Sequence, residues 1–153
     1  MRKFPKSEIE QKTLKMLKKV GLEEFADKKV YELSGGMKQR AGIARALINE
    51  PDILLMDEPF SALDALTREQ MQDFVRKIWW ESGKTIFFIT HDVDEAMMLG
   101  SRVIVLSKRP GRILEEISLD FSQQFIEEHS EKVKYTERYF KIREKLLNAI
   151  NRQ

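Results

Sequence analysis

Three short groups of residues in this sequence could carry out chemistry on a phosphate. Ser34-Gly35-Gly36 has the composition of a helix start, where a serine caps the helix and exposed backbone N–H groups attract anions. Asp57-Glu58 follows four apolar residues, so two carboxylates stand at the end of an expected strand. His91 follows a second apolar run. These residue types suit a phosphate, a magnesium ion and an attacking water.

We expect the two carboxylates and the histidine to have separate tasks. Adjacent residues on a strand point to opposite sides, so Asp57 is expected to hold Mg²⁺, usually through water, while Glu58 orients or deprotonates the attacking water. His91 could bond to a terminal phosphate and stabilise its charge. Plainer explanations stay open for each group taken alone: an ordinary capped helix, a turn capped by carboxylates, or a histidine that satisfies the start of the next helix.

The loop that usually holds nucleotide phosphates is absent from the sequence. No segment has the pattern Gly-x-x-x-x-Gly-Lys-Ser/Thr. Gly83-Lys84-Thr85 has the end of that pattern, but Ile78 stands where its first glycine belongs. The tripeptide also leads from an expected helix into a strand, whereas a phosphate loop leads from a strand into a helix. We do not expect it to bind phosphate.

Helices and strands are expected to alternate along the chain. A capping box formed by Ser7 and Glu10 predicts the first helix, and Asp64 or Thr67 is expected to cap the longest one. The apolar runs predict strands that are buried on both faces, as in a parallel sheet covered by helices. The expected helices are 7–20, 35–49, 64–83, 92–99 and 135–150, and the expected strands are 53–56, 85–90, 103–106 and 113–119, the last two as a hairpin.

This arrangement brings the candidate residues together. Ligands of such sheets lie beyond the carboxyl ends of the strands, where Asp57, Glu58 and His91 all fall.

Bulk properties agree with one domain of ordinary size: 153 residues, 42% hydrophobic and 34% charged. Zero cysteines exclude disulfides and thiolate metal sites, and a net charge of +2 is too small to indicate nucleic acid. A membrane span needs about 18 consecutive apolar residues, and the sequence has no such run.

The same residues resemble the motifs of the ATP-binding cassette (ABC) ATPases. Leu33 to Arg40 is similar to the signature motif of that family, and Ile53 to Pro59 to its Walker B strand with a catalytic glutamate. Ser61 to Asp64 resembles the D-loop, and Thr90 to Asp92 the switch-histidine loop. The motifs occur in the family's order over about residues 7–119. Further similarity, around 41–47, 95–96 and 109–113, is greatest to the ATPases of nitrate, sulfonate and taurine importers.

The resemblance implies a function, partners and site residues. It implies an ATP-hydrolysing subunit, peripheral on the inner face of the cell membrane, that pairs with a second ATPase subunit and drives a transmembrane permease, without nucleic acid. ATP and Mg²⁺ are the implied cofactors. Ser34, Gly35, Gly36 and Gln39 would contact ATP held by the opposite subunit, and Asp64 would lie across the dimer interface. Asp57 would support Mg²⁺, Glu58 the water, and His91 the γ-phosphate of ATP in cis, on the same subunit.

The chain departs from the family ahead of its signature motif. The adenine-stacking aromatic, the phosphate-loop lysine and the Q-loop glutamine precede that motif in the family, and here only 32 residues precede Leu33. The chain is therefore expected to correspond to the C-terminal part of such a subunit, lacking Walker A, and to be inactive alone. A different role is also open: a non-catalytic module that offers its signature motif to a complete subunit.

These considerations predict an α/β fold with an incomplete P-loop NTPase-type parallel sheet and flanking helices. Residues 1–50 are expected to be part of the helical subdomain and to contain the signature helix. Residues 51–120 are expected to be the C-terminal part of the ATPase core. Residues 121–153 are expected to form a linker and an amphipathic helix. In the family, the phosphate-loop strand lies between the strand that ends at His91 and the strand that contains Ile104. Its loss should leave one apolar edge of each of these strands unpaired, which favours aggregation.

Overall fold

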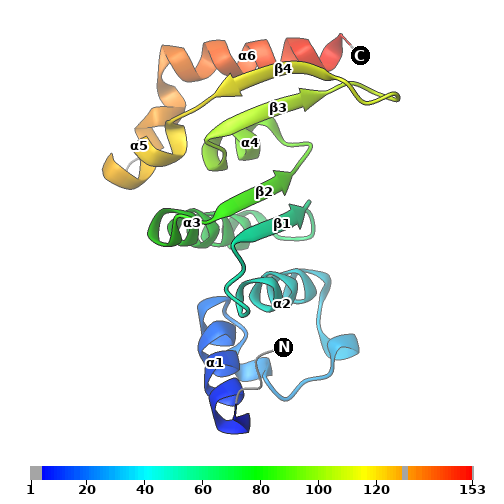
Figure 1. The fold of residues 1–153 in the computed structure, drawn as a ribbon, viewed down its shortest axis with the longest axis vertical. Helices are drawn as coiled ribbons and strands as arrows, with labels where there is room; N and C mark the ends of the chain where they lie inside the picture. The colour runs from blue at the N-terminus through cyan, green and yellow to red at the C-terminus, as the bar shows by residue number, and fades with distance from the viewer. Residues whose placement is uncertain (1–4, 129–130, 153) are drawn as a thin grey trace. The chain divides into compact units, whose positions relative to one another are not determined.

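The computed structural model describes residues 5–128 and 131–152, which form two compact units, 1–87 and 88–153. The elements follow one another in the mixed helix and strand order that the sequence predicts (Figure 1). Those of the first unit are α1 (Lys6–Lys19), η1 (Glu23–Phe25), η2 (Val30–Glu32), α2 (Gly35–Leu47), β1 (Ile53–Asp57) and α3 (Ala65–Ser82), and β2 (Thr85–Ile89) crosses the boundary between the units after Phe87. Those of the second are α4 (Val93–Leu99), β3 (Arg102–Leu106), β4 (Ile113–Ser118), α5 (Phe121–Glu128), η3 (Glu131–Tyr135) and α6 (Glu137–Asn151).

Helix α1 does not begin with the predicted capping box. Its N-cap is Pro5, whose carbonyl accepts hydrogen bonds from the N–H groups of Glu8 at 3.0 Å and Ile9 at 3.1 Å. Ser7 therefore lies inside the first turn and cannot cap it. The restricted φ of proline already suits a helix start, so the chain enters the helix two residues earlier than the serine suggested.

Helices α2 and α3 begin as the sequence predicts. Ser34 caps α2, with its Oγ accepting from the Met37 N–H at 3.2 Å. Asp64, rather than Thr67, caps α3, with Oδ1 accepting from the Thr67 N–H at 3.0 Å. Helix α3 ends where Gly83 takes a left-handed conformation (φ 62°), which a residue without a Cβ adopts at low cost.

Strands β1 and β2 form a two-stranded sheet and run in the same direction (Figure 1). The prediction that both faces are buried is wrong for the described residues. Leu54 and Met56 are buried, but Ile53 is 62% exposed and Leu55 is 73% exposed. The two exposed side chains define the open β1 face. Burial alternates along β2 as well, between exposed and half-buried residues.

The core of the first unit lies on the other side of β1. Phe60, directly after the strand, is completely buried and anchors the loop that leads to α3. The buried apolar residues are Val20, Leu22, Ile43, Ala44, Leu47, Leu54, Met56, Phe60, Leu63, Met71 and Val75.

The second unit is built on the predicted hairpin. Strands β3 and β4 pair antiparallel, from Arg102 opposite Ser118 to Leu106 opposite Ile113, with an irregularity between Val105 and Leu106. Helix α6 runs along this hairpin (Figure 1). Residues 121–128, expected to belong to a linker, form helix α5 because Phe121 is buried in the core of this unit. That core consists of Met97, Met98, Val105, Leu119, Phe121, Val133, Tyr139 and Leu146.

The described strands form two separate sheets, β1-β2 and β3-β4. Among the described residues we find no helix with the length and apolar character needed to cross a bilayer.

Candidate functional site

The start of α2 is shaped to approach other groups closely. Ser34 and Gly35 are exposed, and the first turn of the helix contains no acidic side chain. The first N–H groups of a helix have no acceptor within it, and the helix dipole adds partial positive charge there. This helix start is therefore exposed and free of acidic side chains, and its contact with a phosphate stays a prediction.

The loop after β1 packs directly against this helix start. A Cβ added to Gly36 would lie 3.2 Å from the Ala62 carbonyl oxygen and 3.3 Å from Leu63 Cδ2, and one added to Gly35 would lie 3.8 Å from Ala62 Cβ. Gly36 therefore has a packing role that the phosphate interpretation did not include. The absence of a side chain allows α2 and residues 62–63 to approach each other.

Gln39 joins the helix to the same loop by hydrogen bonds. Its Nε2 donates to Ser61 Oγ at 2.8 Å and to the Glu58 carbonyl at 3.3 Å, and its Oε1 accepts from the Ala62 N–H at 2.9 Å. Gly35 and Gln39 are four residues apart on α2, so they share the face that meets the loop. That spacing is the only sequence signal for this contact, since the partners lie 19 to 23 positions further along the chain.

Arg40 fixes the other side of α2. Its guanidinium donates from Nη1 to the carbonyl oxygens of Val20 at 3.0 Å and Gly21 at 3.1 Å, at the end of α1. Arg40 was part of the predicted signature motif without a role of its own. The structure assigns it to holding α2 against α1.

Asp57 and Glu58 are both exposed at the end of β1. The strand ends at Asp57, and Glu58 has a left-handed backbone with φ 43°. The alternation of side chains along a strand therefore does not extend to Glu58, and it cannot be used to separate the two carboxylates. Their separate roles remain predictions that rest on the resemblance.

A magnesium ion at Asp57 would need ligands from outside the protein side chains. The described residues contain no cluster of three or more His, Cys, Asp or Glu side chains that could hold a metal. Mg²⁺ commonly keeps several waters and binds through one or two carboxylates and the phosphates of its substrate. One exposed carboxylate fits that mode of binding.

Asp64 has a structural task of its own. It caps α3, and hydrogen bonds from Thr67 lower the pKa of its exposed carboxyl group below the ordinary value of 3.8. It is therefore charged at neutral pH. The structure contains one copy of the chain, so a contact across a dimer interface is still a prediction.

His91 is exposed and belongs to the second unit, immediately before α4. The helix start beside it is satisfied by Asp92, whose Oδ1 accepts from the N–H groups of Asp94 at 2.8 Å and Glu95 at 3.1 Å. The Thr90 hydroxyl accepts from the Asp92 N–H at 3.0 Å and donates to Glu95 at 2.8 Å. Asp92 therefore caps α4, and the contact of His91 with a terminal phosphate stays a prediction.

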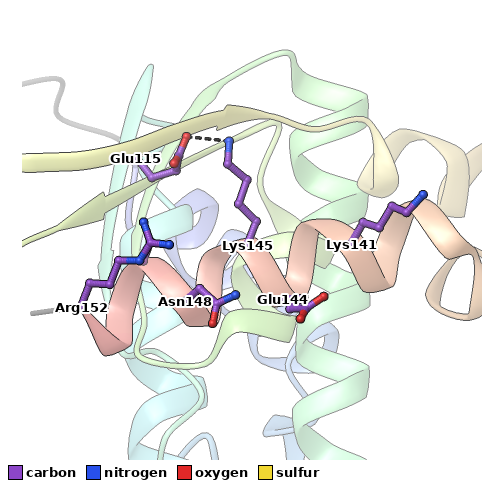
Figure 2. A pocket seen from close by; sticks show the side chains of 7 residues that line it. Glu115, Lys141, Glu144, Lys145, Asn148 and Arg152 are labelled. Atoms are coloured by element: carbon purple, nitrogen blue, oxygen red, sulfur yellow. Dashed lines mark hydrogen bonds and ion pairs between the residues drawn. The ribbon is translucent and has the colours of Figure 1, made fainter.

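A hollow of about 420 Å³ in the second unit lies between β4 and α6 (Figure 2). Its side chains carry both signs of charge, and two of them, Lys145 and Glu115, pair with each other at 2.8 Å. A site for an anion or a cation would need an excess of one sign and buried polar groups. This hollow has an excess of only one positive charge and no buried polar side chain, and we give it no function.

Comparisons with known proteins agree with the motifs. Residues 2–61 match the family described as ABC transporter. A solved ATP-binding cassette, captured as a dimer in a post-hydrolysis state with ADP and Pi, superposes with a TM-score of 0.71 and 39% identity, over 77% of this chain and 50% of that one. By sequence motifs and fold, the chain belongs to the ABC transporter ATPases.

Within that family the chain is similar to subunits of taurine importers. It is 51% identical over 135 residues to the taurine import ATP-binding protein TauB of Jannaschia sp. (strain CCS1), covering 88% of this chain and 50% of the relative. The protein of the same name from Roseobacter denitrificans is 49% identical over 150 residues, which cover 98% of this chain and 56% of the relative. The chain thus spans about half the length of the curated relatives it matches.

Proposed function

We propose that the chain supplies the signature helix, the Walker B carboxylates and the switch histidine of an ATPase that energises a membrane importer. The importer's solute is proposed to be taurine or a related sulfonate or nitrate anion, on the similarity to the taurine import proteins. The proposal includes a second ATPase subunit, a permease, and a position at the inner face of the cell membrane.

One observation carries this proposal beyond the resemblance. The start of α2 and the loop that contains Glu58 are one hydrogen-bonded piece, joined through Gln39, Ser61 and Ala62. In the proposed dimer the start of α2 faces the ATP held by the opposite subunit, whereas Glu58 serves the ATP of its own subunit. The hydrogen bonds through Gln39 would therefore connect the two nucleotide sites.

Each residue is proposed to act as follows. Ser34, Gly35 and Gly36 contact the terminal phosphate of ATP that the opposite subunit holds. Asp57 supports Mg²⁺ through water, Glu58 orients the attacking water, and His91 bonds to the terminal phosphate. ATP, when bound with Mg²⁺, supplies the phosphoryl group that is transferred to water. The residues of the chain contact the phosphate, orient the attacking water and accept a proton from it.

The first prediction concerns activity. The chain alone should release no phosphate from saturating Mg-ATP, because it has no phosphate loop to hold the substrate and correct placement contributes about 7–11 kcal/mol. A hybrid, in which residues 1–153 replace the matching half of the Roseobacter protein, should hydrolyse ATP. Glu58→Gln in the hybrid should abolish turnover, while Lys77→Ala, on an exposed position of α3 outside the proposed site, should leave it unchanged.

Two outcomes would contradict the proposal. One is turnover by the 153-residue chain alone that disappears with Glu58→Gln. The other is a folded hybrid that binds ATP and does not hydrolyse it.

A further inference from the structure

The amide of Gln39 uses both of its donors inside the chain. An amide group has two N–H donors, and here they meet two acceptors, Ser61 Oγ and the Glu58 carbonyl. Its oxygen accepts from the Ala62 N–H. No N–H of this side chain is left for a phosphate.

The partners also require a glutamine in one orientation. A donor, the Ala62 N–H, faces the amide oxygen, and a carbonyl oxygen faces the amide nitrogen. Rotating the amide by half a turn would set donor against donor and oxygen against oxygen. Glutamate could replace only the acceptor half of this arrangement, and alanine could replace neither half.

The backbone that this network holds is that of Glu58. A residue with a side chain seldom adopts a φ of 43°, and it does so where its surroundings impose it. The Glu58 carbonyl accepts from the Ser61 N–H at 3.3 Å and from Ser61 Oγ at 3.0 Å, in addition to Gln39. Ser61 Oγ is itself held by Gln39 Nε2. The direction of the Glu58 side chain therefore depends on hydrogen bonds that begin on α2.

We propose that Gln39 is a positioning residue that locks the backbone of Glu58 and of residues 61–62 to the start of α2. It acts through Glu58 and does not touch the nucleotide, in contrast to the role that the resemblance implied. Its effect on hydrolysis rests on the proposed function. The lock itself does not, since it is a set of contacts within the chain.

Hydrogen exchange at the Ala62 amide tests the lock in the full 153-residue chain. In Gln39→Ala this amide loses its acceptor and should exchange roughly fivefold to tenfold faster. In Gln39→Glu it keeps an acceptor and should stay protected. The matched control is Lys38→Ala, next to Gln39 on the same helix and exposed. Equal exchange rates in Gln39→Ala and Lys38→Ala would overturn the proposal.

The hybrid subunit provides a second measurement that does not depend on the stability of the isolated chain. Gln39→Ala and Gln39→Glu should both lower kcat about tenfold to a hundredfold, because Glu58 is displaced, with KM for ATP changed by no more than about twofold. A rise in KM with unchanged kcat would show that Gln39 binds the nucleotide, and would overturn the proposal. If the parent hybrid is inactive, the proposed function fails, and Ala62 exchange still decides whether the lock exists.

Discussion

Asp94 shows how a single carboxylate links two helices of the second unit. It accepts from the Tyr139 hydroxyl at 2.8 Å and from Arg143 Nε at 3.0 Å, both on α6. Burial alone would raise the pKa of Asp94, but the hydrogen bonds from Arg143 and Tyr139 and the charge of Lys134 outweigh it, so this pKa lies below 3.8. Burial, together with Asp94, raises the pKa of Tyr139, which therefore stays protonated.

This link gives the second prediction, on pH dependence. A carboxylate whose pKa is lower in the folded state than in the unfolded state stabilises the fold above pH 3.8, and this stability is lost as pH falls through the folded pKa. Asp94→Asn should reduce the free energy of unfolding at pH 7 by about 1 kcal/mol, a value discounted because Asp94 is partly exposed.

The measurement is urea unfolding of Asp94→Asn and of the unsubstituted chain at pH 7 and again near pH 3. The difference between the two chains should shrink at the lower pH. Glu144→Gln is a suitable control, because Glu144 is exposed and lies on α6, the helix that carries Tyr139 and Arg143. A difference for Asp94→Asn that is the same at both pH values would contradict the assignment.

At the residue scale, local chemistry was predictable and distant contacts were not. The cap Ser34, and Asp64 as one of two candidates, could be predicted because a cap and the N–H that it satisfies are three positions apart, although the cap predicted at Ser7 was wrong. The contacts of Gln39 and Arg40 span 19 to 23 positions. Nothing in the local pattern of the sequence fixes which loop folds back onto which helix.

Helix α2 offers a comparison between two of its glycines, which is the basis of the third prediction. A methyl group at Gly36 would press on the Ala62 carbonyl at 3.2 Å, whereas a methyl group at Gly42 would meet nothing within 4 Å. Gly36→Ala should destabilise the first unit by about 1–3 kcal/mol, because backbone on both sides must move apart. Gly42→Ala should stabilise it by about 0.5–1 kcal/mol, as alanine is the better helix former.

Urea unfolding of the two variants measures both effects. The pair separates packing from general helix propensity, since the same substitution is made in the same helix. Equal stability of Gly36→Ala and Gly42→Ala would contradict this prediction. The close contact between α2 and residues 62–63 would then not contribute to stability, and Gly36 would be needed only for the approach of a ligand.

At the element scale, the sequence pattern indicated the four strands and every α-helix of the described residues except α5, but it did not indicate which strand faces are buried. The apolar run 53–56 predicted a strand covered on both faces, and Ile53 and Leu55 are exposed. An apolar sequence allows a strand to be buried on both faces, but whether each face is buried depends on which other segments pack against it. Helix α5 was not predicted, because the segment 121–128 is short and has few apolar residues. Its Phe121 is nevertheless buried in the core of the second unit.

At the scale of the whole molecule, the share of the relatives' length that the chain covers and the exposure of apolar side chains on β1 both agree with a chain that corresponds to part of a larger subunit. The chain spans 50% and 56% of the two taurine import relatives, and its open β1 face carries apolar side chains of the kind that a complete domain usually covers. Family resemblance could indicate that the chain corresponds to one part of a larger subunit. It could not indicate which side chains this arrangement exposes.

The open β1 face gives the last prediction, on self-association. Leu55, 73% exposed on a strand, should promote association between copies of the chain, because water is released when two such faces meet. Leu55→Lys should therefore lower the fraction of oligomer in sedimentation velocity experiments without loss of helix content. Leu54→Lys is the matched control: Leu54 is only 5% exposed, and burying a charge there should unfold the unit. Oligomer content that is unaffected by Leu55→Lys, or unfolding equal to that of Leu54→Lys, would show that the face is covered in solution.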